Sequence, residues 1–255
     1  MKTKSTYFMV IETSDYLHRL EANQFNLFTQ KLHNGISKVL SKFNGEVISH
    51  NDNTYKVSFN QVTDTILCAI KLQYNFKYIT PKFDKSIRRL KIGISTETGN
   101  GNGITLATRM CEIVKDQIVI EAGVKKDYQK ENKNAFINKG HFRTLKASES
   151  SFLTKTMDYI ETIWNNPTFC LDDVSIPLGY SKSQVYRKMM SLTGMPLSSF
   201  IRNYRLNKAM HLMHFRKGKI MDVAKRTGFA NAGHFSKCFK DKFDILPSKY
   251  LQQHT

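Results

Sequence analysis

Apolar and polar residues follow two periodicities over the first 120 residues. Helical spacing places the apolar residues of 27–43 and of 64–76 largely on one face of each segment. The order β, α, β-hairpin, α, β, α, β predicts an α+β domain with a ferredoxin-like, mainly antiparallel sheet and helices on one face. Strand-like patterns occupy residues 6–12, 46–59, 88–96 and 116–122.

The C-terminal part of the chain, from residue 149 onwards, has only helical periodicity. Before it, residues 123–150 are polar, basic and weakly periodic, so we place a domain boundary near Ser148, between an α+β domain at 1–148 and an all-α domain at 149–255. Seven helices are predicted in the second domain, at residues 152–164, 171–178, 183–192, 199–215, 220–227, 232–242 and 248–252.

The all-α domain contains an internal duplication. Leu171–Met190 and Ile220–Phe239 share a pattern about 49 residues apart, and each reads as a helix, a turn with glycine and a second helix. This order is typical of a helix-turn-helix, so we predict two such units. The matching pairs are Val174 and Val223, Gly179 and Gly228, Tyr180 and Phe229, Tyr186 and Phe235, Lys188 and Lys237, and Met190 and Phe239.

Charge favours a polyanionic partner. The 255 residues carry a net charge of +18, with 16 Lys and Arg against 7 Asp and Glu from residue 151 onwards. No run of eighteen apolar residues and no secretion signal is present, so we expect a cytoplasmic protein without a membrane partner. Cys68, Cys111, Cys170 and Cys238 lack metal-ligand spacing, so we expect no metal and no cofactor.

The second helix of each unit has an apolar underside and polar residues that can reach the bases of double-stranded DNA. In the first unit Val185, Met189 and Leu192 are predicted to face inward, and in the second Phe235, Cys238 and Phe239. The predicted DNA-binding residues are Ser181, Lys182, Gln184, Arg187 and Lys188 of the first unit, and Asn231, Ala232, Gly233, His234, Ser236 and Lys237 of the second.

Individual roles leave alternatives open. Arg187 can bond both acceptors of a guanine, or it can bind a phosphate or stay in solvent. Gln184 and Asn231 can read adenine, cap a helix or bind a phosphate. His234 can touch a base, while its neighbour Gly233 suggests a close approach of the backbone instead.

At these residues the chain resembles the AraC family of transcription regulators. The family signature is similar to the run DVAKRTGFANAGHFSKCFKDKFDILPSKY at 222–250, and Arg205, Leu206 and Ala209 match its linker helix. The resemblance covers about residues 150–253. It implies a bacterial, sequence-specific transcription regulator that can contact RNA polymerase. Asp244 departs from the pattern, because the family usually has glycine there, and this puts the local turn in doubt.

The N-terminal part resembles a class III nucleotidyl cyclase domain over about residues 6–145. FMVIETSDYLHRL is similar to the first strand and turn of that family, GEVISHNDNTYKVSF to its central hairpin, and KIGISTETG to its next strand. ITLATRMCEIVKDQIVIEAGVKKDY is similar to its last helix and strand.

The residues that the cyclase resemblance assigns to catalysis are mostly replaced. Val10 and Asn53 stand where the family has metal-binding aspartates, and Thr105 replaces the ribose-orienting asparagine. Ser49 replaces the base-selecting lysine, whereas Arg109 is kept as a remnant that could still contact a nucleotide. Without two carboxylates the metal ions of phosphoryl transfer have no ligands. We therefore expect no enzyme activity; the alternative is a DNA-gated nucleotide cyclase or another nucleotide-processing enzyme.

Two roles remain for the degenerate cyclase-like domain. It can form a homodimer, which would raise the effective concentration of the DNA-binding modules on paired sites. It can also sense an effector, either a small molecule or a nucleotide. The run GNGNG at Gly99–Gly103 follows a strand and precedes a helix, but it lacks the GxGxxG spacing, so we interpret it as a flexible turn and not as a phosphate cradle.

Overall fold

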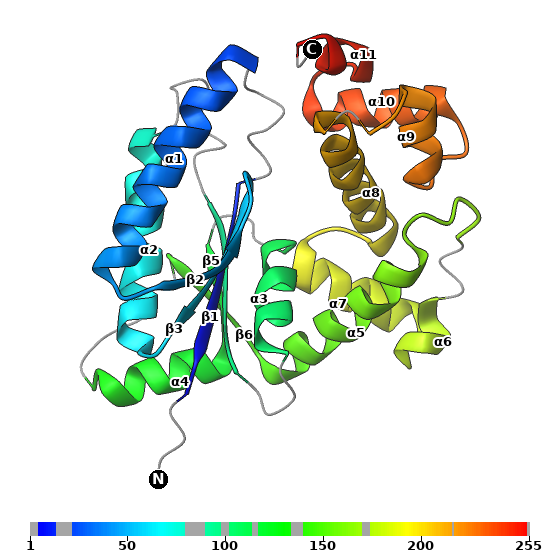
Figure 1. Ribbon diagram of the computed structural model, residues 1–255. Coiled ribbons are helices and arrows are strands. Elements are labelled where there is room, and N and C mark those ends of the chain that lie inside the picture. The colour runs from blue at the N-terminus through cyan, green and yellow to red at the C-terminus, as the bar shows by residue number, and fades with distance from the viewer. Residues whose placement is uncertain are drawn as a thin grey trace. The chain divides into compact units, whose positions relative to one another are not determined.

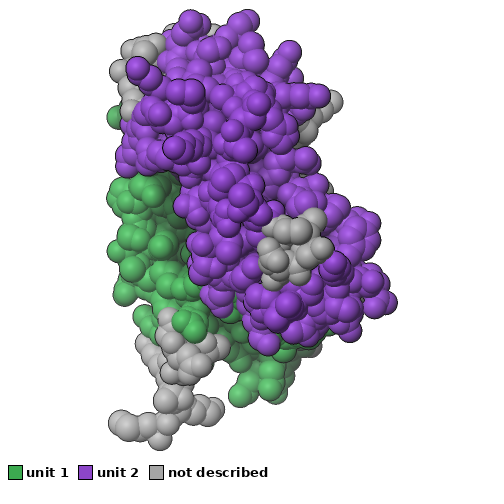
Figure 2. Space-filling model, turned by 90° about the vertical axis from the view of Figure 1, so that its right-hand side faces the viewer, with its two compact units in different colours: residues 1–15, 25–154 green, residues 16–24, 155–255 purple. Residues whose placement is uncertain are grey.

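The computed structural model describes residues 5–13, 22–79, 90–97, 102–113, 117–133, 140–169, 174–215 and 217–253. The chain divides into two compact units, coloured separately in Figure 2. The division falls between Thr154 and Lys155, within helix α5 (Ala147–Ile163), whereas the boundary predicted near Ser148 lies in the first turn of that helix.

A six-stranded sheet forms the centre of the first unit, in the order β2-β3-β1-β4-β5-β6. The pairings β2–β3, β3–β1 and β1–β4 are antiparallel, and β4–β5 and β5–β6 are parallel. The predicted class, a sheet with helices ahead of an all-helical region, is confirmed. The strands are β1 (Tyr7–Glu12), β2 (Glu46–His50), β3 (Thr54–Phe59), β4 (Lys91–Thr96), β5 (Ile118–Glu121) and β6 (Phe142–Leu145).

Helices cover both faces of this sheet (Figure 1). Val10 of β1 packs against Ala107 and Cys111 of α3 (Gly103–Cys111). Tyr7 lies three residues earlier on β1, so it points to the opposite face, where its hydroxyl donates to Asp127 of α4 (Ala122–Glu131) at 3.0 Å. Figure 1 places α1 (Ala22–Lys42) and α2 (Val62–Ile79) on the same face as α4.

The prediction of helices on one face only was therefore wrong in this detail. Met9, Val10 and Ile11 are consecutive and all fully buried, which requires cover on both faces of β1. Gly93 lies opposite Val10 on β4, and a Cβ there would come within 2.2 Å of the Ala107 carbonyl oxygen. The small residues Gly93 and Ala107 thus let α3 pack closely against the second face of the sheet.

The polar and weakly periodic stretch at 123–150, where we placed the domain boundary near Ser148, contains two further elements of the first unit. Helix α4 buries Val124 and Tyr128, and strand β6 buries Phe142 and Leu145 while it extends the sheet. Both elements are short and contribute few apolar residues, so their periodicity was too weak to recognise.

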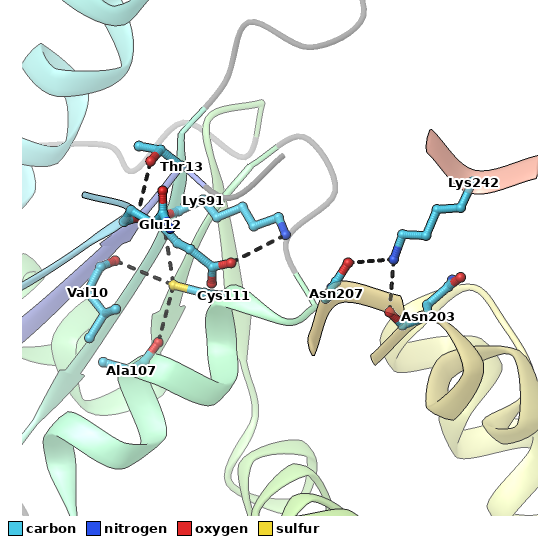
Figure 3. A network of polar contacts seen from close by, with 10 residues as sticks. Val10, Glu12, Thr13, Lys91, Ala107, Cys111, Asn203, Asn207 and Lys242 are labelled. Carbon is cyan, nitrogen blue, oxygen red and sulfur yellow. Dashed lines mark hydrogen bonds and ion pairs between the residues drawn. The ribbon is translucent and has the colours of Figure 1, made fainter. Parts of the chain in front are cut away.

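A buried thiol lies under β1 (Figure 3). The Sγ of Cys111 is 3.5 Å from the Val10 carbonyl oxygen and 3.6 Å from that of Ala107. Burial raises the pKa of this thiol well above its usual range, and burial also raises the pKa of Cys68 to about 12. Both thiols are therefore unreactive, and their side chains pack in the core. Cys170 lies outside the described residues.

The second unit is helical throughout its described residues. Its long helix α8 (Leu197–His214) connects two short helix pairs, α6 (Ser175–Leu178) with α7 (Lys182–Thr193), and α9 (Ile220–Arg226) with α10 (Ala232–Phe243). The pairs contact opposite ends of α8, and α11 (Pro247–Gln253) follows α10 (Figure 1). The core around the second pair consists of Leu206, Ala209, Met210, Met213, Val223, Ala224, Phe229, Phe235, Phe239, Phe243 and Tyr250.

Parts of several predicted features fall on residues outside the described ranges. Among them are residues 14–20 of the run compared with the first strand and turn of the cyclases, residues 88–89 of the strand predicted at 88–96, and the first three residues of the helix predicted at 171–178. Of the GNGNG run, only Asn102 and Gly103 are described, at the start of α3. Within the described ranges, every helix is too short or too polar to span a bilayer.

Candidate nucleic-acid interface

A glycine with positive φ forms the turn of each helix pair. Gly179 has φ 68° and Gly228 has φ 77°, a region that side chains other than glycine rarely adopt. A Cβ at Gly179 would meet no atom within 4 Å, whereas a Cβ at Gly228 would come within 2.9 Å of the Trp164 carbonyl oxygen. The two turns therefore share a backbone conformation but differ in packing.

From the turn glycine to the start of the second helix, the second pair has one residue more than the first, which corrects part of the predicted repeat. Helices α7 and α10 both contain 12 residues and begin at Lys182 and Ala232, so their residues correspond at a separation of 50 and not 49. The correction places Val185 opposite Phe235, and both are buried.

Burial shows that the earlier pairing of these helices was wrong. Tyr186 and Met190 are 54% and 37% exposed, whereas their supposed partners Phe235 and Phe239 are fully buried. The structural counterpart of Phe239 is Met189, which is also buried. The pairs ahead of the turn, among them Val174 with Val223, keep the separation of 49 because the extra residue follows Gly228.

The N-cap of each second helix uses one of the residues predicted to read adenine. In α7 the Ser181 hydroxyl accepts from the Gln184 amide, and the Gln184 side chain accepts from the Ser181 amide at 2.9 Å, which is a capping box. In α10 the Asn231 side chain accepts from the amides of Gly233 and His234. The side-chain oxygens of Gln184 and Asn231 therefore accept hydrogen bonds at the helix N-termini, and their NH2 groups remain available as donors.

The predicted DNA-binding residues lie at the surface of the second unit. Lys188 places its ammonium 4.8 Å from the centre of the Tyr180 ring, and Ser236 donates to the Ala232 carbonyl at 2.8 Å. Exposed residues are Ser181, Lys182, Gln184, Arg187, Asn231, Gly233, His234 and Lys237, and half-buried ones are Lys188, Ala232 and Ser236.

Arg187 and Lys237 occupy the same position on the two helices. Each is the sixth residue of its helix, is exposed, and follows the buried pair Val185 and Phe235 by two positions. A cation at this position is the clearest feature that the two exposed faces have in common. His234 stands one residue before Phe235, and its Nε2 lies 3.3 Å from the Cys238 sulfur. Cys238, predicted to face inward, is half-buried and packs against the core around the second helix pair.

Two cations of the second unit serve the fold. The Arg205 guanidinium donates to the carbonyls of Trp164, Asn166 and Gly228, so it ties the end of α5 to the second turn. Burial lowers the pKa of Arg205. Lys242 donates to the Asn203 carbonyl at 2.9 Å and to the Asn207 side chain at 2.6 Å (Figure 3).

These two roles could not be recognised from charge alone. Their positions along the helices could have indicated these roles, because Arg205 stands next to the buried Leu206 within α8 and Lys242 precedes the buried Phe243. A cation beside core positions is more often anchored than one on an open helix face.

Asp244 ends α10 in the left-handed conformation with φ 61°. Its counterpart at the end of α7 is Gly194, with φ 73°. The departure from glycine therefore leaves the turn geometry in place. An aspartate tolerates this region less well than glycine, so the residue carries a local conformational cost.

The residues matched to cyclase catalysis differ in their exposure in the first unit. Val10 is fully buried against α3, and Asn53 is 3% exposed in the turn between β2 and β3. Arg109 is 7% exposed and donates to the Thr154 carbonyl at 3.3 Å. Thr105 and Ser49 are exposed.

The helix pairs are similar to helix-turn-helix domains of known proteins. Residues 176–253 match the family model described as a helix-turn-helix domain. The HTH-type transcriptional activator RhaS of Klebsiella pneumoniae is 31% identical over 83 residues, which are 32% of this chain and 30% of that protein. Histidine kinase P4 of Formosa agariphila is 29% identical over 112 residues, which are 44% of this chain and 8% of that protein.

Among solved structures, one example of similarity is a protein that this chain covers almost completely. It is a transcriptional regulator from Chromobacterium violaceum described by its AraC-type DNA-binding domain, with 25% identity and a TM-score of 0.39, covering 43% of this chain and 97% of that one. The chain spans 30% or less of the length of the two curated relatives above. Residues 176–253 form a helix-turn-helix domain of the AraC type, as the sequence predicted.

Proposed function

We propose that the protein is a sequence-specific transcription regulator that binds double-stranded DNA through α7 and α10. One observation carries the proposal. Two helix-turn-helix units, joined by a single helix, bury equivalent framework residues and expose polar second helices with a cation at the same position. This is the arrangement by which such units place a second helix in the major groove.

In this proposal the exposed residues divide into two groups. Arg187 reads a guanine, because its planar fork can bond both acceptors on the major-groove edge. Lys182, Lys188 and Lys237 bind phosphates and set the position of each helix. At the tip of α10, Gly233 allows a close approach of the backbone, and His234 contacts a base edge.

The remaining residues act through the helix ends. Ser181, Gln184 and Asn231 hold the first turns of α7 and α10 and offer their remaining donors to DNA. The half-buried Ala232 does so through its backbone, and the Ser236 hydroxyl, whose proton is donated to the Ala232 carbonyl, accepts from a base amino group. The amides at a capped N-terminus carry partial positive charge, which favours a nearby phosphate.

A binding experiment with two kinds of DNA tests the function. The full chain is incubated with promoter fragments and with shuffled fragments of equal length, over a range of salt concentrations. We expect a subset of promoters to bind more tightly than shuffled DNA, with a loss of about 10³-fold or more between 50 and 200 mM salt if six or more phosphates are contacted. Equal affinity for all fragments at every salt concentration would exclude sequence-specific regulation.

For the first unit we propose dimerisation or effector sensing without catalysis. Val10 fills the space beside α3 where a metal-binding carboxylate would be required, so no observation favours the cyclase alternative. Incubation with ATP or GTP and Mg²⁺ or Mn²⁺ is expected to give no cyclic product. A homodimer in the bacterial cytoplasm, with contacts to RNA polymerase when bound at a promoter, completes the proposal, and sedimentation of the full chain measures its oligomeric state.

A further inference from the structure

A hollow lies in the first unit between α1 and the hairpin of β2 and β3. Its volume is about 530 Å³, enough to admit a small organic molecule. Tyr55 in its wall pairs with Ile11 on β1, so it faces away from the side on which Val10 meets α3. The hollow therefore lies on the other face of the sheet from Val10, whereas the matched positions Ser49 and Asn53 directly adjoin its lining residues His50 and Asp52 in the sequence. It is lined by His33, Asn34, Ser37, Val47, His50, Asn51, Asp52 and Tyr55.

Three rings form a compact group at the base of this hollow. The Nδ1 atom of His33 is hydrogen-bonded to the Tyr55 hydroxyl. His50 stacks on Tyr55, with ring centres 5.1 Å apart and planes inclined by 14°. The rings of His33 and His50 are 5.7 Å apart. When the Tyr55 hydroxyl donates to Nδ1, neutral His33 carries its proton on Nε2 and can donate it to a bound molecule.

The surroundings of His33 disfavour its charged form. The pKa of His33 is lowered, first by burial and then by the nearby His50, while Asp52 acts in the opposite direction. Burial also raises the pKa of Tyr55, so its hydroxyl stays protonated at neutral pH. His33, His50, Asp52 and Tyr55 are the titratable groups of the lining. A negative charge between the imidazoles would relieve their repulsion.

Hydrogen-bond donors outnumber carboxylates around the hollow. The Asn51 side-chain oxygen accepts from the amides of Asn53 and Thr54, which leaves its NH2 group as a donor. Asn34 adds a second side-chain amide and Ser37 a hydroxyl. Asp52 is the single carboxylate of the lining, and it is exposed.

A metal ion fits this composition poorly. Across the part of the chain that the structure describes, no three His, Cys, Asp or Glu side chains are grouped so that they could hold a metal. Residues 1–150 also carry 23 Lys and Arg against 14 Asp and Glu, which favours anions near this unit.

We infer that the hollow binds a small oxyanion, a carboxylate or a phosphate, between His33 and His50. The imidazoles and the amides of Asn34 and Asn51 supply the donors, and Val47 with the His50 ring offers an apolar wall for the rest of the ligand. Because the anion favours the charged imidazoles, its affinity falls as pH rises through their titration. The inference does not depend on DNA binding, but it supplies an effector site for the proposed regulator.

Histidine resonances of the full chain test the inference directly. The protein is titrated with sodium phosphate, with sodium benzoate and with neutral benzamide, and the ring Cε1–H signals are followed by NMR. We expect saturable shifts of His33 and His50 with at least one anion, none with benzamide, and binding weaker by about tenfold at pH 8 than at pH 6. The phosphate and benzoate arms decide between the two oxyanions. The absence of a saturable shift at both histidines with either anion would overturn the inference.

Variants separate the hollow from other basic surfaces. His50→Gln removes one imidazole from an exposed position without a buried cavity, so we expect it to fold and to lose at least tenfold in anion affinity, whereas His141→Gln, at an exposed position of the same unit, should change nothing. Asp52→Asn removes a negative charge that repels a bound anion, so it should tighten anion binding severalfold. Asp52 also raises the pKa of His33, so this comparison is made at low pH, where His33 is protonated in both proteins; weaker anion binding in Asp52→Asn there would contradict the assignment, because a cation site would respond in that direction.

A final control separates this inference from the proposed function. Arg187→Ala lies in the other unit, on the exposed face of α7, and should leave the shifts of His33 and His50 unchanged while it weakens DNA binding. Normal anion binding without sequence-specific DNA binding would reject the proposed function alone. Sequence-specific DNA binding without anion binding would reject the oxyanion site alone.

Discussion

The two helix-turn-helix units have the same framework and different exposed residues. Val174 and Val223 are both buried ahead of the turn, and Gly179 and Gly228 share a positive φ. The second helix-turn-helix unit has the more aromatic core, in which the ring of Phe239 contacts those of Phe235, Phe243 and Tyr250. Packing thus preserves the outline of the duplicated unit while its details differ.

The exposed ends of α7 and α10 differ most. Helix α7 begins with a capping box and presents Lys182, where α10 begins with Asn231 and presents Ala232 and then Gly233. Only the cation of Arg187 and Lys237 is common to both. Core packing constrains the framework but not the exposed ends, so we expect the two helices to recognise different base sequences and not two copies of one element.

The largest difference that we predict between the two helix-turn-helix units concerns their turn glycines. Gly228→Ala combines a left-handed conformation, which costs about 1–2 kcal/mol, with a close contact to the Trp164 carbonyl, so we expect a total loss of about 3 kcal/mol or more. Gly179→Ala should lose only the first amount. Urea unfolding of the full chain measures both, and equal losses would show that packing does not distinguish the turns.

Arg187→Ala should have the next largest effect, and it acts on DNA binding. We expect a loss of about 1–3 kcal/mol in binding free energy and a relaxed preference at one base pair. Lys237→Ala should weaken all sequences alike and reduce the salt dependence by about one contact. Affinities for a panel of single-base variants of the bound site measure the difference, and an unchanged base preference in Arg187→Ala would remove this residue from recognition.

The helix caps give a smaller and symmetrical prediction. Ser181→Ala and Asn231→Ala each remove an acceptor for amides in the first turn, and each should cost about 1 kcal/mol of stability. Gln184→Glu keeps the acceptor of the capping box but adds a negative charge beside DNA, so stability should be retained while affinity falls. Thermal unfolding and DNA binding are measured in parallel; normal affinity in Gln184→Glu would place this side chain away from the phosphates.

The smallest effect that we predict is a gain. Asp244→Gly gives α10 the residue that α7 has at Gly194, and it relieves a left-handed aspartate. We expect stability to rise by up to about 1 kcal/mol. Gly194→Asp is the matched control and should lose a similar amount. A loss of stability in Asp244→Gly would mean that the aspartate makes a favourable contribution that outweighs its backbone cost.

The sequence predicted the fold class of both compact units of the chain, because it carries strong periodicity and a repeated turn. It predicted Val185, Met189 and Phe239 as inward-facing residues correctly, since apolar residues at helical spacing have one way to be buried. The register between the repeats was wrong beyond the turn. A single inserted residue ahead of α10 shifts every later pair, and only burial reveals which side chains are equivalent.

Other features required the structure because they depend on contacts between distant segments. Helix α3 reaches the second face of the sheet because Gly93 and Ala107 are small, and neither residue indicates this by itself. Arg205 and Lys242 look like DNA-binding cations in a basic domain, yet both are bonded to backbone carbonyls. The roles of the exposed residues on α7 and α10 stay predictions.

Selection of bound sequences from a random DNA library, followed by sequencing, tests the central claim most directly. The account predicts a motif of two short, unlike elements whose centres lie about one helical turn, roughly 10 base pairs, apart, with one element lost in Arg187→Ala. A single element, or a selected pool without any common sequence, would contradict the conclusion that α7 and α10 read DNA together.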